Sequence, residues 1–201
     1  MPQDSWFYFL AIESDLERTA RFVEPTLAND SCYSVEFARL LMGAAAEVEA
    51  VATQLARTVT ALPTDTNIDD LRAAFQQHYP NFHTIEILVP RASRKLNPWR
   101  AWAGAKNPKW WTAHNRVKHD RHNSFTDASL VNALEAVAAL LCLQLYVHQR
   151  EYKEGSLEPW CRFLSVKGHW ESIIAGPGDR FRTFHDDSSS RWVGSCTWGP
   201  K

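Results

Sequence analysis

The first half of the chain carries apolar residues spaced by threes and fours, which is the spacing of an amphipathic helix. Residues 5–23 show this pattern and stop before Pro25. A longer stretch begins at Ser34, a residue type that commonly caps a helix, and Pro63 ends it. A shorter stretch covers residues 67–78. The pattern therefore predicts three helices in this half of the chain.

Residues 124–150 carry the strongest helix signal, because the stretch is apolar on nearly every face. Glu135 is its only acidic residue after the start, where Ser124 and Asp127 have the spacing of a capping box. A membrane span needs roughly 20 predominantly apolar residues, whereas the strictly apolar run 136–143 is far shorter. We therefore expect a central core or dimerisation helix and no membrane span.

The C-terminal part has a different texture, with short β-branched or aromatic runs at 163–166, 169–175 and 181–185. Gly-Pro-Gly-Asp at 176–179 is a turn signal between the last two runs, so they are expected to form a hairpin. The polar end that follows is expected to be partly disordered.

These patterns together predict a mainly α protein, a helical bundle with a small C-terminal β-hairpin-like appendage. Residues 1–152 are expected to form the bundle and residues 153–201 the β-rich extension. Residues 85–89 form one extended segment in this interpretation. Prolines and a glycine make residues 90–112 irregular, and they belong to a basic, tryptophan-rich insertion at about 90–122.

Composition narrows the class of protein. A chain of 201 residues with 45% hydrophobic and 22% charged residues is long and apolar enough to bury a core, which excludes a wholly disordered protein. The four cysteines are scattered without a CxxC pair, so neither a disulfide scaffold nor a zinc finger is indicated. The N-terminus lacks the basic region and long apolar core of a signal peptide, which predicts a cytoplasmic protein.

Charge is distributed unevenly along the chain. Residues 1–90 have a net charge of −8, residues 91–122 of +8 and residues 123–201 of −1. The basic segment contains four tryptophans, and cations interleaved with flat aromatic rings suit a nucleic-acid strand; they are Trp99, Trp102, Trp110 and Trp111. Two other interpretations stay open: a solvated loop anchored to the core by its tryptophans, or an interface neutralised by the acidic segments.

The densest chemistry lies at residues 114–122, which hold three histidines and three permanent cations. A zinc site is not expected, because cationic neighbours oppose a divalent ion and no carboxylate pair accompanies the imidazoles. We therefore expect no metal and no cofactor. Cleavage of RNA without a metal needs a proton acceptor, a proton donor and a cation for the phosphate, which histidine and arginine supply. The alternative is a solvated connection that precedes the next helix.

Arg116 and His122 fit the Arg-x4–6-His motif of HEPN domains, with five residues between them. The mostly helical chain, its long second helix and the position of the motif before the last apolar helix also resemble that family. The resemblance implies a helical-bundle homodimer in which paired motifs form one cleft. It also implies a metal-independent endoribonuclease of a toxin–antitoxin or antiviral system. The residue after the motif arginine is usually polar in that family, whereas here it is Val117.

The resemblance and the residues together give the functional prediction. Arg116, His122 and His119 are expected to be catalytic. RNA is expected to contact the neighbouring side chains Asn115, Lys118, Arg121, Trp110 and Trp111. The expected partners are RNA, a second copy of the chain and an antitoxin or effector-complex protein. The alternative, which Val117 favours, is a non-catalytic module that binds nucleic acid or a partner protein. A purely structural subunit, with the basic segment as its docking surface, is the third class considered.

Overall fold

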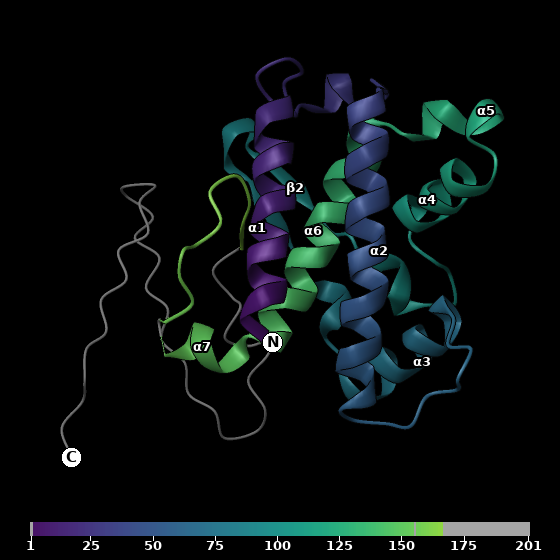
Figure 1. The fold of residues 1–201 in the computed structure, drawn as a ribbon, viewed down its shortest axis with the longest axis vertical. Coiled ribbons are helices and arrows are strands. Elements are labelled where there is room, and N and C mark those ends of the chain that lie inside the picture. The colour runs from purple at the N-terminus through teal and green to yellow at the C-terminus, as the bar shows by residue number, and fades with distance from the viewer. Residues whose placement is uncertain (1, 155, 167–201) are drawn as a thin grey trace.

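Helix α6 lies at the centre of the fold, with α1, α2 and α4 packed around it (Figure 1). The protein is described by a computed structural model in which residues 2–154 and 156–166 are placed. The α-helices of this part of the chain are α1 (Pro2–Thr19), α2 (Val35–Arg57), α3 (Ile68–His78), α4 (Lys109–His119), α5 (Arg121–Ser124), α6 (Leu130–Val147) and α7 (Gln149–Lys153). The mainly α class predicted from the sequence is confirmed.

The α6 helix is the apolar helix predicted at 124–150, and it forms the core of the bundle. Its residues from Ala136 to Leu145 are all buried, including Cys142 and Gln144. By length and composition alone α6 could cross a membrane, but 72% of that window is buried inside the fold. This burial is typical of the central helix of a globular domain, since lipid-facing side chains would instead lie on the outside.

The predicted start of α6 is wrong by several residues, and the structure gives the reason. Residues Phe125–Asp127 form a 3-10 turn, and the helix begins only after Ser129, whose side chain makes no capping hydrogen bond. The first amide groups of α6 are bound by the carbonyls of a distant loop instead: Leu130 N donates to Cys32 O and Val131 N to Asp30 O. A backbone partner thus replaces the side-chain cap.

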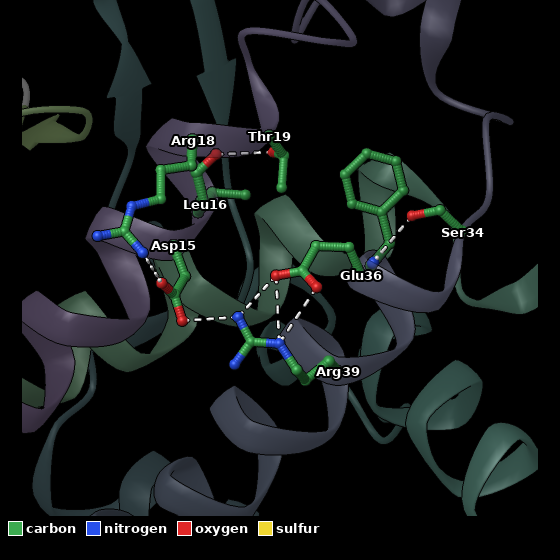
Figure 2. A network of polar contacts seen from close by, with 8 residues as sticks. Asp15, Leu16, Arg18, Thr19, Ser34, Glu36 and Arg39 are labelled. Carbon is green, nitrogen blue, oxygen red and sulfur yellow. Dashed lines mark hydrogen bonds and ion pairs between the residues drawn. The ribbon is translucent and has the colours of Figure 1, made fainter.

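Helices α1 and α2 pack side by side in front of α6. Ser34 caps α2 as predicted, accepting a hydrogen bond from Phe37 N at 3.0 Å. An exposed network joins the two helices (Figure 2): Arg39 donates to Asp15 at 2.7 Å and to Glu36 at 2.6 Å. Exposed pairs of this kind contribute little to stability each, so the buried apolar faces hold the helices together.

A small antiparallel sheet covers part of the bundle, with the strand order β2-β1-β3. Its strands are β1 (Ile87–Val89), β2 (Arg94–Leu96) and β3 (Ser165–Val166). Strand β1 lies in the segment predicted to be extended, whereas β2 lies in a segment predicted to be irregular. Only β3 comes from the C-terminal part, and the predicted hairpin at 169–185 lies outside the described residues.

The C-terminal segment that leads into β3 is fixed to α1 by a buried carboxylate. Glu13 is 3% exposed and accepts hydrogen bonds from the backbone N–H groups of Arg162, Phe163 and Leu164, at 2.8 to 3.1 Å. Burial raises the pKa of Glu13, and the three N–H groups oppose that rise. This segment is therefore tied to the helices by an ionisable group in the interior.

Candidate functional site

The basic motif lies on helices α4 and α5, whereas the alternative interpretation of the sequence was a solvated connection before the next helix. Helix α4 starts after Pro108 and buries Trp110, Ala113, His114 and Val117 against the bundle. These positions are spaced by three and four residues, so one face of α4 is apolar. Proline is tolerated at a helix start because the first N–H groups have no partner within the helix.

The cationic side chains of the motif lie on the opposite, solvent-facing side. Lys118, His119, Arg121 and His122 are exposed, and Asn115 is half-buried. Among the described residues, no hydrogen bond or ion pair engages the side chains of these four exposed residues. These four side chains are therefore accessible to a ligand.

Arg116 is also exposed, with 64% of its side chain accessible, but it has a partner. Its Nη1 lies 3.1 Å from Oδ2 of Asp127, in the turn that precedes α6. The carboxylate that binds Arg116 is that of Asp127 and not that of Glu47. Glu47 is half-buried on α2, and burial raises its pKa.

Arg116 and His119 belong to the same helix, α4, whereas His122 belongs to the next helix. Residues three apart on an α-helix are neighbours on its surface, so Arg116 and His119 share one side of α4. His122 lies on the separate one-turn helix α5. No hydrogen bond joins Arg116 to either histidine within the described part of the chain, and all three side chains face solvent in the single protomer.

The predicted role of the tryptophans as base-stacking rings is wrong for this conformation. Trp110 is 2% and Trp111 is 6% exposed, and Trp99 and Trp102 are buried with them. The indole N–H of Trp110 donates to Pro98 O, and that of Trp99 donates to Ala139 O of α6. This arrangement matches the interpretation in which the tryptophans anchor the basic segment to the core.

His114 is separated from the other two histidines by its burial. It is 3% exposed, its ring packs 5.2 Å from that of Trp111, and Nδ1 has no partner within the described residues. Burial, with smaller contributions from Lys118 and His119, lowers its pKa to about 4. His114 is therefore neutral at physiological pH. No group of three or more His, Cys, Asp or Glu in the described part of the chain is arranged to hold a metal ion.

A second cluster of charges, missed by the sequence analysis, lies between the sheet and α6. Arg94 of β2 is 7% exposed and donates to Asp30 from its two terminal nitrogens, Nη1 to Oδ1 and Nη2 to Oδ2, the latter at 3.1 Å. Glu135 of α6 lies nearby, and burial raises its pKa to about 7. Glu135 Oε2 and Arg94 Nε are buried without a hydrogen-bond partner among the described residues.

An open hollow of about 490 Å³ lies on the outer face of α2, lined by Ala46, Glu49, Ala50, Thr53, Gln54 and Arg57. These residues belong to the C-terminal half of α2, whereas α5 lies at the opposite end of the bundle (Figure 1). None of the residues predicted to act on RNA lines this hollow. The candidate site therefore lies apart from this hollow.

Comparison with known proteins adds no identity. No protein-family model matches the chain, and no match is found among curated proteins or solved structures.

Proposed function

We propose that this protein is a HEPN-like, metal-independent endoribonuclease that acts as a homodimer in the cytoplasm, as a toxin or an antiviral effector. The observation that carries the proposal is the exposed cationic surface of α4 and α5. Five basic or titratable side chains there face solvent: Arg116, Lys118, His119, Arg121 and His122. Such a density of positive charge suits the phosphates of RNA.

The chemistry assigned to these residues is cleavage through the ribose 2′-OH. One histidine takes the 2′-OH proton as the oxygen attacks phosphorus, and another gives a proton to the departing 5′-oxygen. Arg116 holds the phosphate with parallel N–H donors and keeps its charge throughout. A bound phosphate would replace Asp127 as the partner of Arg116.

A second copy of the chain supplies what one protomer lacks. His119 and His122 stand on an open surface in the single chain, whereas general acid and base must both reach the same phosphate. Two copies facing each other across α4 and α5 would place two sets of these side chains around one strand.

The alternative is a module that binds RNA, or a partner protein such as an antitoxin or a member of an effector complex, without cleaving. Two observations favour it. Val117, which follows the motif arginine, is fully buried and serves packing. Arg116 already has a carboxylate partner in Asp127.

The test is cleavage of labelled RNA by purified protein in the presence of EDTA. We expect wild-type protein to cut and the double variant His119→Ala/His122→Ala to lose all cutting. His78→Ala, a half-buried histidine at the end of α3, is the control and should cut like wild type. Intact RNA with wild-type protein would exclude the nuclease.

The alternative is separated by binding at several salt concentrations. Binding through the α4–α5 surface should weaken steeply as salt rises, because each phosphate contact releases counterions. Binding that is insensitive to salt would instead indicate docking of a protein partner.

A further inference from the structure

Tyr33 is an exposed aromatic residue beside the cationic surface, although it lies more than 80 residues before it in the chain. It is 53% exposed, and its ring packs edge-on against Phe125, with centroids 5.7 Å apart and planes at 83°. Phe125 begins the turn that follows α5. Phe125 thus supports the Tyr33 ring, while more than half of Tyr33 faces solvent.

Backbone hydrogen bonds hold Tyr33 in this place. Tyr33 and Ser129 form an antiparallel bridge. On either side of it, Ser34 N donates to Ala128 O at 3.3 Å and Leu130 N donates to Cys32 O at 2.8 Å. The loop before α2 is therefore fastened to the segment between α5 and α6, and the ring does not depend on its own side-chain contacts for position.

The same segment carries the candidate site. Asp127, two residues after Phe125, binds Arg116. His122 precedes Phe125 by three residues, on the short helix α5 that leads directly into this turn. The other strongly exposed aromatic residues of the described chain, Phe7, Tyr8 and Phe22, belong to α1 and the turn after it.

We propose that Tyr33, braced by Phe125, is a stacking platform for an unpaired base of RNA whose phosphates lie on the cations of α4 and α5. An exposed ring next to phosphate-binding cations is the arrangement by which proteins hold single strands. The substrate class is thus single-stranded RNA or the loop of a hairpin, because the bases of a continuous duplex are already stacked on each other. This inference rests on the proposed binding of RNA.

The expected effect is a loss of affinity confined to single strands. Removing one base–aromatic stack reduces affinity by roughly 5- to 100-fold. Tyr33→Ala should show a loss of this size, whereas Tyr33→Phe, which keeps the ring, should bind like wild type. Tyr8→Ala is the matched control, because Tyr8 on α1 is also 53% exposed but lies away from the candidate site.

The experiment measures fluorescence anisotropy of labelled 2′-O-methyl RNA, which lacks the attacking hydroxyl and cannot be cut. A single strand and a blunt duplex of equal length are compared at one salt concentration, and circular dichroism checks that each variant is folded. The inference is supported if Tyr33→Ala loses affinity for the single strand but not for the duplex, and if Tyr8→Ala binds both RNAs like wild type.

Two other outcomes would overturn the inference in different ways. Wild-type protein that binds RNA with Tyr33→Ala within twofold of it would refute the stacking platform and leave the proposed function standing. Equal losses on single strand and duplex would mean that Tyr33 acts through the fold and not by stacking. Absence of RNA binding by wild type would refute the proposed function and the inference together.

Discussion

Replacing Glu135 by glutamine should stabilise the protein, and the gain should grow as pH rises. Glu135 is partly buried beside Arg94 and Asp30, and its buried oxygen Oε2 lacks a hydrogen-bond partner among the described residues. Burial raises its pKa from 4.5 to about 7, Arg94 opposes the rise and Asp30 adds to it. The Glu135→Gln variant keeps the shape of the side chain and removes the charge.

The size of the effect follows from proton linkage. Between pH 4.5 and about 7 the unfolded chain has lost this proton while the folded protein retains it, so stability falls as pH rises through this range. At about 1.4 kcal/mol for each pH unit, the full difference in unfolding free energy is about 3.5 kcal/mol. Between about pH 5.5 and about pH 8.5, wild type should lose about 2 kcal/mol of unfolding free energy relative to Glu135→Gln.

Urea denaturation followed by tryptophan fluorescence measures this difference, because Trp99, Trp102 and Trp110 are buried. The free energy of unfolding is taken for wild type and Glu135→Gln at both pH values. His114, whose pKa is lowered to about 4, makes both proteins less stable below about pH 6.5, and this contribution cancels in the comparison. A stability difference that is the same at both pH values would refute the reasoning.

Three further predictions concern the charges around α4 and α6. Arg94→Met removes the buried guanidinium that binds Asp30, whose side chain is 31% exposed, and should cost about 1.5–3 kcal/mol in urea denaturation; a cost below about 0.5 kcal/mol would contradict a stabilising pair. Val117→Asn, which gives the motif its usual polar residue, should lower the melting temperature without raising RNA cleavage, because position 117 is fully buried. Asp127→Asn frees Arg116 and should tighten RNA binding several-fold in anisotropy titrations; unchanged affinity would mean that Arg116 does not contact RNA.

The helices of the first half were predictable because their signals are local. Ser34 caps α2, and Asn67 caps α3 by accepting from Asp69 N and Asp70 N. Each of these contacts spans two or three residues, so the order of residue types is sufficient to reveal it. The apolar spacing that predicted the buried faces is equally local.

The start of α6 and the helix α4 were missed for two different reasons. The α6 amides bind carbonyls almost 100 residues away in sequence, and nothing near Ser124 records that partner. In α4, the burial spacing of Trp110, Ala113, His114 and Val117 was hidden because tryptophan and histidine beside cations also suit a nucleic-acid surface. The same ambiguity led to the wrong role for Trp110 and Trp111.

The candidate site was predictable in its chemistry but not in its surroundings. The exposed basic residues all lie between positions 116 and 122, so this concentration of basic side chains was evident from the sequence. The contact of Asp127 with Arg116 depends on how α4 packs beside the turn that precedes α6. The contact of Tyr33 with Phe125 depends on how the loop before α2 pairs with the segment before α6. A single sequence without homologues carries no record of such long-range contacts.

The buried tryptophans of the basic segment limit the ways in which its charges can be removed without unfolding the protein. Trp99 and Trp110 fill the interior and donate to carbonyls there, so excising residues 90–122 would hollow out the scaffold that presents the charges. The charges of this surface are therefore best removed by substituting single solvent-facing side chains. For the same reason, substitutions among the exposed side chains of α4 and α5 change the charge of this surface without disturbing the buried indoles.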